Sequence, residues 1–297
     1  MEHEMMNAME IRRNDQAPAG TMRMSEKEFN LISKFIYSEL GIKMPPAKKL
    51  MLSVRLSRRI KTLGLSSYMD YYNHLFTTKD RDEEYNLMID AVTTNKTEFF
   101  REPNHFTVLA RDVLPLMAQA KLVRAGKPLE VWCAGCSTGE EAYTLAMVLE
   151  DFVHSIPGAD YRILATDVSR RVLRVAKEGI YRDGALGPVP PQFKRKYFMR
   201  GKGTFEGHHR VVPELRKKVT FRQLNFMDAD FGIRTRMSVV FCRNVVIYFD
   251  RQTQVEFFGK IFHHLDPGGF LFIGSSETLF GISESFTSVG PTVYRRS

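Results

Sequence analysis

The stretch that decides the fold reads Glu130-Val-Trp-Cys-Ala-Gly-Cys-Ser-Thr-Gly-Glu-Glu-Ala-Tyr143. An apolar strand pattern at 129–133 runs into a loop of small residues, and a helix is expected to begin at Glu140. A strand, a glycine loop and a helix in this order are typical of the cofactor pocket of a doubly wound sheet. Because Glu140 and Glu141 would repel a phosphate at the helix N-terminus, the loop suits a positively charged nucleoside better than a pyrophosphate.

Strand and helix patterns alternate downstream of this stretch. This alternation predicts an α/β fold, a doubly wound, Rossmann-like parallel sheet with helices on both faces. Pro267-Gly268-Gly269 is expected to stop a helix and turn the chain into the last parallel strand. Residues 286–296 are expected to form a terminal hairpin. The expected strands are 129–133, 161–167, 219–224, 238–242 and 270–274, and the expected helices are 140–154, 169–178 and 251–265.

The N-terminal part of the chain has a different pattern. Ser25-Glu-Lys-Glu28 has the form of a capping box, and helical periodicity follows at 49–63, 67–76 and 81–92. These features predict an all-helical domain at 25–92, joined by a linker at 93–104 to the α/β domain at 105–297. Residues 1–24 are polar and lack the apolar core of a signal peptide, so a disordered leader is expected.

A further segment interrupts the α/β alternation. Short strand-like pieces at 196–200 and 209–212 flank a glycine-rich turn. They predict a small antiparallel β-subdomain, inserted at about 190–218.

Composition narrows the classes of partner. The formal net charge of +9 suggests an anionic partner, either nucleic acid or an acidic protein surface. No apolar run approaches the roughly 18 residues of a membrane helix, so membrane insertion is not expected. The three cysteines, Cys133, Cys136 and Cys242, suit a reducing cytoplasm. Cys133 and Cys136 could be a redox pair or half of a zinc site, but further ligands at zinc spacing are lacking, so no metal is expected.

Several polar residues follow the predicted strands, where an open α/β sheet binds its ligand. Asp167 ends the second strand and could accept hydrogen bonds from ribose hydroxyls, or could instead cap the next helix. Asn225 follows the third strand and could reach an adenine edge. Arg243, Asn244 and Tyr248 follow the fourth strand, although Tyr248 could equally be an ordinary core aromatic.

Several longer motifs of the chain are specific. They are Thr93-Thr-Asn-Lys-Thr-Glu-Phe-Phe-Arg-Glu102, Ser137-Thr-Gly-Glu-Glu141, Ala165-Thr-Asp167, Tyr197-Phe-Met-Arg-Gly201, Phe241-Cys-Arg-Asn-Val-Val-Ile-Tyr-Phe-Asp250 and Gly274-Ser-Ser-Glu277. With these motifs the chain resembles, over residues 25–297, the CheR family of chemotaxis receptor methyltransferases. The resemblance implies S-adenosyl-L-methionine as methyl donor and S-adenosyl-L-homocysteine as product. It implies glutamates on the cytoplasmic domain of chemoreceptors as acceptors, and therefore a protein-glutamate O-methyltransferase that works in the cytoplasm at membrane-bound receptor arrays.

The same resemblance implies roles for individual residues. Arg101 and Tyr248 are expected to be catalytic, with Tyr248 near the transferred methyl group. Either Arg101 or Arg243 could orient the acceptor carboxylate, and either could instead hold the donor's own carboxylate. The residues expected to bind the cofactor are Asn95, Thr97, Arg101, Glu141, Asp167, Asn225, Phe226, Cys242, Arg243 and Asn244.

Two regions are candidates for receptor docking. Arg55, Arg58 and Arg59 fall off the apolar stripe of their predicted helix and could bind an acidic receptor helix, or could be a solvated basic face. The small β-subdomain resembles the one with which some members bind a C-terminal receptor tail as an added strand. There Arg200, Gly201 and Arg210 are the expected contacts, and a purely structural flap is the alternative.

Two rival functions fit the sequence less well. The basic net charge would suit a nucleic-acid methyltransferase. However, Arg243-Asn-Val-Val246 lacks the prolines that are typical of adenine methyltransferases at this place. No aromatic residue interleaves with the basic run at 48–61, so nucleic acid is not an expected partner. A catalytically inactive donor-binding scaffold is the other alternative, and the presence of Asn95, Arg101, Asp167 and Tyr248 argues against it.

Overall fold

The computed structural model describes residues 22–283 and 285–297. The chain divides into two compact units, with the boundary between Thr93 and Thr94. The first unit is all-helical in its described part, and the second is an α/β unit with a small antiparallel sheet. The predicted fold class is therefore confirmed.

The helical unit forms around the apolar stripes that the sequence predicts. Ser25 and Glu28 make a complete capping box at the start of its first helix, which ends at Gly41 with a left-handed φ of 68°. Ile36, Leu56 and Ile60 are among its fully buried side chains. The helices are α2 (Glu26–Leu40), α3 (Lys49–Thr62), α4 (Tyr68–Thr77) and α5 (Arg81–Val92), with a short 3-10 turn at Pro46–Lys48.

The leader expected at 1–24 lies outside the described residues except at its end. There Met24 is buried, and the Met22 carbonyl accepts hydrogen bonds from the hydroxyls of Ser53 and Tyr68. Residues 22–24 therefore pack on the helical unit and do not belong to a disordered leader.

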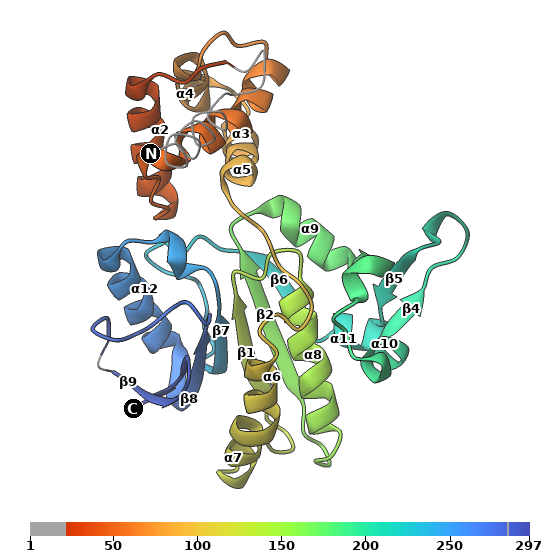
Figure 1. The fold of residues 1–297 in the computed structure, drawn as a ribbon. Coiled ribbons are helices and arrows are strands. Elements are labelled where there is room, and N and C mark those ends of the chain that lie inside the picture. The colour runs from red at the N-terminus through yellow and green to blue at the C-terminus, as the bar shows by residue number, and fades with distance from the viewer. Residues whose placement is uncertain (1–21, 284) are drawn as a thin grey trace, which may run out of the picture. The chain divides into compact units, whose positions relative to one another are not determined.

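The α/β unit is built on a twisted sheet (Figure 1). In its described part seven strands occur in the order β6-β2-β1-β7-β8-β10-β9. The first five are parallel, and β10 runs antiparallel between β8 and β9. The strands are β1 (Leu129–Ala134), β2 (Tyr161–Asp167), β6 (Val219–Gln223), β7 (Met237–Cys242), β8 (Leu265–Ile273), β9 (Phe286–Gly290) and β10 (Val293–Arg296). The five predicted parallel strands and the terminal hairpin are confirmed.

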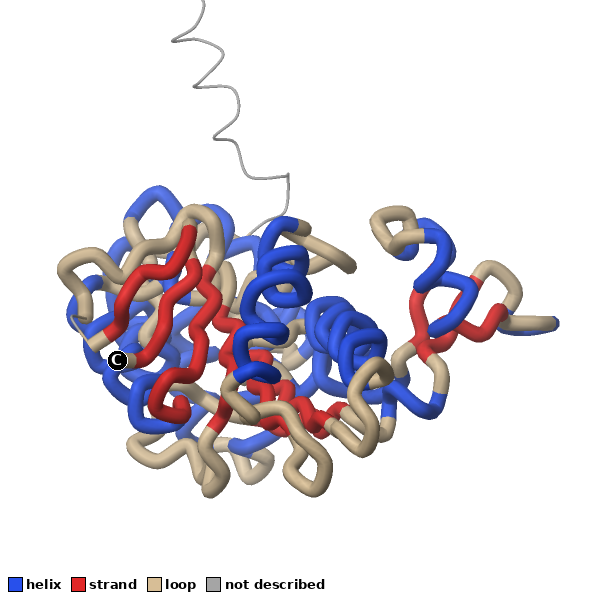
Figure 2. The backbone as a smooth tube through the Cα atoms, turned by 90° about the horizontal axis from the view of Figure 1, so that it is seen from below, coloured by secondary structure: helices blue, strands red, loops and turns tan. Residues whose placement is uncertain are grey.

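Helices cover both faces of this sheet (Figure 2). Cys133 and Phe241 point into one core with the helices that precede β1, whereas Trp132 packs among Phe226, Phe231 and His264 on the opposite face. Because the strands from β6 to β8 are parallel, the loops that follow β1, β2, β6 and β7 lie at the same, carboxyl edge of the sheet. The helices are α6 (Asn104–Val108), a π-helical turn (Leu109–Val113), α7 (Leu114–Gln119), α8 (Glu140–Val153), α9 (Arg170–Glu178) and α12 (Arg251–His264).

The turn predicted at 267–269 is wrong, because these residues belong to β8. The pairing of β8 with β7 shifts register between Met237 and Val239, which makes a bulge. A Cβ at Gly269 would lie 2.9 Å from the carbonyl oxygens of Asp266 and Ser238. The glycine therefore allows the strand to continue through the bulge.

A second, three-stranded antiparallel sheet has the order β3-β5-β4 (Figure 1). Its strands are β3 (Ile180–Arg182), β4 (Phe198–Arg200) and β5 (His208–Val211). β3 precedes the insert expected at 190–218, so the small sheet begins earlier than predicted. Residues 196–197 end helix α10 (Pro191–Tyr197) and are not part of the predicted strand. Helix α11 (Pro213–Arg216) leads from β5 back to β6.

Candidate functional site

The loop between β1 and α8 is held in a conformation that needs its glycines. Gly135 and Gly139 have φ values of 82° and 95°, in the left-handed region. A Cβ at Gly135 would lie 2.4 Å from Cγ2 of Val245, in the turn after β7. The N–H groups of Gly135 and Cys136 donate to the Thr166 carbonyl at 2.8 and 2.9 Å. The loop is thus fixed between the ends of β2 and β7.

Asp167 fastens this loop from the end of β2. Its carboxylate accepts hydrogen bonds from the N–H groups of Ser137 at 2.9 Å and Ser169 at 3.0 Å. Ser169 is the residue that caps α9, since its hydroxyl accepts from the Val172 N–H. The capping role considered for Asp167 is therefore wrong, and its carboxylate lies beside the glycine loop.

Glu141 and Arg243 form a buried ion pair near the loop. Oε2 of Glu141 lies 3.3 Å from Nη1 of Arg243, and Oε1 accepts a hydrogen bond from the Cys133 thiol at 3.3 Å. Burial raises the pKa of Glu141, and the positive charge of Arg243 opposes that rise. This end of the sheet therefore presents a carboxylate whose charge depends on its cationic neighbour.

Arg243 has hydrogen-bonding capacity to spare. Its side chain is fully buried, and Nη2 donates to the Arg101 carbonyl at 2.5 Å. Its guanidinium also lies 5.4 Å from the centre of the Phe106 ring. Nε and Nη1 are buried without a hydrogen-bond partner among the described residues. Nη1 still faces the Glu141 carboxylate in the ion pair, so Nε is the donor that lacks any acceptor, and a buried unpaired donor is costly.

The segment after Thr94 contributes residues to the same place. The Asn95 carbonyl accepts from the Ser137 hydroxyl at 2.9 Å, and Nη1 of Arg101 donates to the Lys96 carbonyl at 3.0 Å. Thr97 lies half-buried between them. The buried ring of Phe99 anchors the segment through edge-on contacts with Tyr181 and Phe198.

The remaining predicted cofactor residues follow β6 and β7. Asn225 is half-buried, and its side-chain oxygen accepts from the Met227 N–H at 3.0 Å. The Phe226 ring packs on Phe257 of α12, with 4.7 Å between ring centres. Cys242 is fully buried at the end of β7, where burial raises the pKa of its thiol. Asn244 follows with a left-handed φ of 58°.

Tyr248 ends a 3-10 turn (Val246–Tyr248) and is only half-buried. The alternative that it is a core aromatic is therefore wrong. The structure brings Asn95, Arg101, Glu141, Asp167 and Arg243 into one connected region. Their contacts with a donor stay predictions.

Sequence reasoning missed three residues of this region. Cys133 donates to Glu141, while Glu102 and Glu277 both hydrogen-bond to Asn244. Glu102 and Glu277 end the first and last of the family-like motifs, so their position in those motifs was the available signal.

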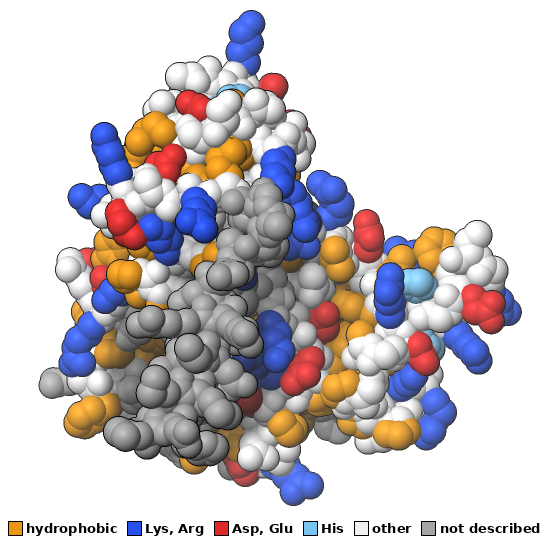
Figure 3. Space-filling view, turned by 45° about the horizontal axis from the view of Figure 1, so that its top comes forward, with side chains coloured by type: hydrophobic (Ala, Val, Ile, Leu, Met, Phe, Trp, Pro, Cys, Tyr) orange, Lys and Arg blue, Asp and Glu red, His pale blue; other side chains and the backbone are white. Residues whose placement is uncertain are grey.

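The predicted docking arginines differ in their surroundings. Arg55 donates to the carbonyls of Val92 and Thr93, and Arg59 forms an ion pair with the buried Glu84. Arg58 is exposed on the same helix. In the small sheet Arg200 and Arg210 are exposed, and a Cβ at Gly201 would collide with the Phe205 carbonyl at 2.1 Å. Figure 3 shows Lys and Arg side chains on the surface of both regions, interspersed with acidic ones.

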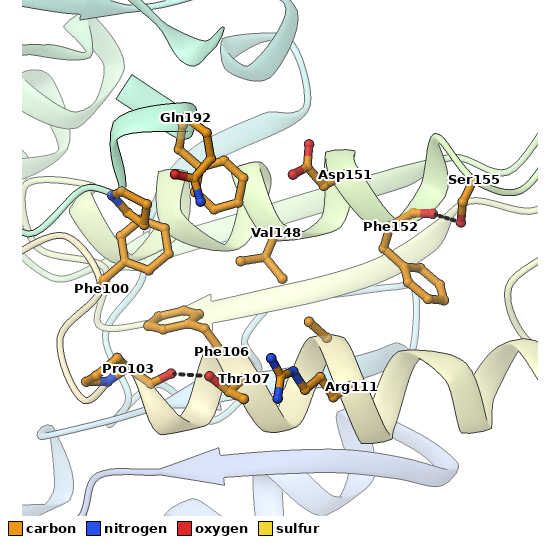
Figure 4. A pocket seen from close by; sticks show the side chains of 13 residues that line it. Phe100, Pro103, Phe106, Thr107, Arg111, Val148, Asp151, Phe152, Ser155 and Gln192 are labelled. Atoms are coloured by element: carbon orange, nitrogen blue, oxygen red, sulfur yellow. Dashed lines mark hydrogen bonds between the residues drawn. The ribbon is translucent and has the colours of Figure 1, made fainter. Parts of the chain in front are cut away.

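A separate cavity of about 600 Å³ lies between α6, α8 and α10 (Figure 4). Phe100, Phe106, Val148 and Phe193 form its apolar walls, and Arg111 extends into it. It contains none of the predicted site residues, so the candidate site is defined by the loops at the carboxyl edge of the sheet.

Comparison with known families decides what this arrangement is. Residues 95–295 match the family model described as "CheR methyltransferase, SAM binding domain", and residues 27–93 match "CheR methyltransferase, all-alpha domain". The chain belongs to the CheR methyltransferase family. The CheR resemblance predicted from the sequence motifs is thereby confirmed.

Relatives of this CheR-family chain align over nearly their whole length. It is 39% identical to the chemotaxis protein methyltransferase of Escherichia coli, covering 93% of each chain. It is 38% identical to chemotaxis protein methyltransferase 2 of Pseudomonas aeruginosa, covering 91% of this chain and 93% of the relative. Identity to the chemotaxis protein methyltransferase of Borreliella burgdorferi is 34%, over 93% and 96% of the two chains.

The CheR-family chain is an S-adenosylmethionine-dependent methyltransferase, and its site fits that donor. The glycine loop leaves no room for a side chain, the Asp167 carboxylate lies beside this loop, and Nε of the buried Arg243 lacks a hydrogen-bond partner among the described residues. The assignment of these groups to ribose, sulfonium and carboxylate of the donor stays a prediction. Within 22–283 and 285–297, no group of three or more His, Cys, Asp or Glu is placed to hold a metal ion. Among the same residues, no helix has both the length and the apolarity to cross a bilayer.

Proposed function

We propose that this CheR-family methyltransferase methylates glutamate side chains on the cytoplasmic domain of chemoreceptors, giving glutamyl methyl esters. The names of its relatives, chemotaxis protein methyltransferases, support this class of acceptor. The observation that supports the site assignment is the buried Arg243, which contacts Glu141 and the Arg101 carbonyl while its Nε has no hydrogen-bond partner among the described residues. The enzyme is proposed to work in the cytoplasm and to be recruited to receptor arrays.

The two arginines differ in access, and this suggests a division of roles. Arg243 is fully buried, so it suits the carboxylate of the small donor molecule. Arg101 is half-buried in a segment flanked by exposed residues, so it suits the carboxylate of a protein acceptor. A glutamate is already ionised at neutral pH, so a strong general base is not required.

The chemistry then depends on positioning. The donor supplies an electrophilic methyl group on a sulfonium. Arg101 is proposed to orient the acceptor carboxylate, and the Tyr248 hydroxyl to fix that carboxylate or the methyl group in line. Burial around Arg243 and Glu141 removes water from the reacting centre.

Receptor binding is proposed to use both docking regions. On α3 the exposed Arg58 is the contact with an acidic receptor helix, and Arg55 and Arg59 add charge from partly buried positions. In the small sheet β4 lies at an edge, where a receptor tail can add as a further strand. Arg200, Gly201, Phe205 and Arg210 line a hollow of about 190 Å³ beside it.

The test is an incubation of the purified chain with radiolabelled donor and, separately, a receptor cytoplasmic domain, DNA and RNA. The expected result is label on the receptor alone, released by mild base as expected of a carboxyl ester. Label on nucleic acid, or base-stable label on the receptor, would contradict the proposal. A competing tail peptide should lower the rate if the small sheet is a docking site.

A further inference from the structure

Two glutamates without an assigned role meet at the turn that follows β7. Glu102 lies between Phe99 and α6, and Glu277 follows β8, so they are distant in sequence. Both have little solvent exposure, and both contact Asn244. The turn at 242–248 carries Arg243 and Tyr248, so whatever fixes this turn affects the proposed site.

Glu277 accepts backbone hydrogen bonds from the turn and from the end of β8. Its Oε2 accepts hydrogen bonds from the Asn244 N–H at 3.0 Å and the Gly274 N–H at 2.6 Å. Glu277 is itself buried. One buried carboxylate therefore ties the turn, at Asn244, to the end of β8, at Gly274.

Glu102 holds the same turn from another side. Its Oε1 accepts from the side-chain amide of Asn244 at 3.2 Å, and its Oε2 accepts from the Ser275 N–H at 3.0 Å. The same Oε2 lies 3.4 Å from Nη2 of Arg243. Glu102 thus joins Arg243, Asn244 and the loop after β8 through one carboxylate.

The backbone around these contacts is strained and tightly packed. Asn244 and Glu102 have left-handed φ values of 58° and 53°. Such conformations in non-glycine residues persist only where the surroundings enforce them, and they cluster at functional sites. At Gly274 a Cβ would lie 2.6 Å from Nδ2 of Asn244 and 2.8 Å from Oε2 of Glu277, so the contact leaves no room for a side chain.

The turn also contacts the glycine loop between β1 and α8 directly. Val245, next to Asn244, lies where a Cβ on Gly135 would be. A displacement of the turn would therefore move both Arg243 and the wall of the glycine loop.

We propose that Glu102 and Glu277 form a carboxylate clamp that fixes the turn at 242–248 and so positions Arg243 and Tyr248 against the glycine loop. Both glutamates are positioning residues, since they act through the turn. The inference rests on the proposed roles of Arg243 and Tyr248, but the clamp's geometry does not depend on the acceptor. A glutamine at either place would offer one acceptor oxygen and turn an NH₂ group toward other N–H groups.

The test uses Glu277→Gln and Gly274→Ala in the full chain. Glu130→Gln is the control, because Glu130 is a partly buried glutamate near the start of β1, whereas the glycine loop follows the end of that strand. Kinetics with a receptor cytoplasmic domain should show kcat about 100-fold lower in both clamp variants, as expected for a misplacement near 1 Å. KM for the receptor should change less than about twofold, because the docking regions lie elsewhere. The control should match the unaltered protein.

Amide hydrogen exchange measures the clamp without an acceptor. In the unaltered protein the amides of Asn244 and Gly274 should exchange slowly, and in Glu277→Gln exchange over 242–249 should rise at least about tenfold with other segments unchanged. Unchanged kcat and exchange in a folded Glu277→Gln would overturn the proposal. Rapid exchange of these amides in the unaltered protein would do so too, even if the variants fail to fold. If the receptor is not methylated, exchange alone still tests the clamp.

Discussion

Single residues in this site are defined by what surrounds them more than by their type. Arg243 could have been an ordinary surface arginine, yet it is fully buried, with two carboxylates within 3.4 Å. Cys133 is a thiol in a pair that resembles a redox motif, yet its hydrogen bond goes to Glu141 and burial raises its pKa well above the usual range. Sequence position predicted that Arg243 would face the site, but not that it would be inaccessible to a protein acceptor.

Replacing Tyr248 by Phe should lower turnover more than donor affinity. The ring stays in place, but the hydroxyl proposed to fix the reacting groups is removed. A loss of kcat of about 10- to 100-fold is expected, with the Kd of S-adenosylhomocysteine within about twofold. Calorimetry and receptor methylation kinetics measure the two effects. Unchanged turnover would rule out the assignment.

His105 should make stability sensitive to acid. Burial and the positive charge of Arg243 together lower its pKa to about 4, although the negative charge of Glu102 opposes the shift. Between about pH 6.5 and pH 4 the unfolded chain therefore binds a proton that the folded chain does not, so stability falls as the pH drops through this window.

Thermal unfolding of the unaltered protein and of His105→Gln tests this effect. The glutamine can keep a hydrogen bond to the Thr292 hydroxyl, which His105 contacts at 2.7 Å. The melting temperature of the variant should fall less between pH 6.5 and pH 4.5, since other titrating groups are common to both proteins. Parallel curves would count against a neutral buried His105.

Among the elements, the strands were the easiest to predict and the small sheet the hardest. Buried apolar runs bounded by turn residues predict β1 and β2 without knowledge of their neighbours. β3 spans only Ile180–Arg182, and its partner β5 is distant in sequence, so no local pattern identifies it. The sequence did not predict the bulge in β8, because Pro267-Gly268-Gly269 is typical of a turn. Only the pairing of β8 with β7 shows that the strand continues through these residues.

A methyl group at Gly135 in the glycine loop should weaken donor binding, whereas one at Gly126, which precedes β1, should not. Gly135→Ala puts a Cβ 2.4 Å from Val245, so donor affinity should fall at least about tenfold. Gly126→Ala is the matched control, since its φ of 80° is nearly the same but no atom lies within 4 Å. The control should lose about 1 kcal/mol of stability from backbone strain and bind donor normally. Calorimetry with S-adenosylhomocysteine distinguishes them, and equal affinities would show that the close packing is unimportant.

On helix α3, Arg58 and Arg59 are neighbours, but we expect their replacement to affect receptor binding and stability, respectively. Arg59→Ala leaves the buried Glu84 without its cation, so the free energy of unfolding should drop by about 3 kcal/mol. Arg58→Ala should leave the melting temperature unchanged but raise KM for the receptor several-fold, because Arg58 is exposed. Thermal unfolding and methylation kinetics measure both. A normal KM for Arg58→Ala would argue against docking on this face.

For the whole molecule, the sequence was enough to predict the fold class and the CheR family. Both rest on patterns that survive in a single chain, namely alternating strands and helices and several specific motifs. The residue contacts that complete the site were not predictable in this way. Glu102 and Glu277 converge on Asn244 only because folding brings three distant segments together, and the partners of Arg55 and Arg59 lie on another helix.

The net charge of +9 predicts a salt-dependent encounter with an acidic receptor surface. The initial rate at low receptor concentration should fall several-fold as salt rises from about 0.05 to 0.5 M, because exposed charges are screened. The Kd of S-adenosylhomocysteine should change little, since Asp167 and Arg243, two charged residues proposed to bind it, are buried. A salt-independent rate would show that docking does not depend on charge.

The position of β10 has a consequence for how the α/β unit is made. This strand follows β8 and β9 in the sequence but lies between them in the sheet. During synthesis β9 therefore has no strand to pair with until residues 293–296 have left the ribosome. The glycine loop and Asp167 emerge much earlier, so the sheet that carries them is completed only when residues 293–296 are free to pair. Folding of the complete sheet, and with it the start of activity, is therefore expected to wait for this strand.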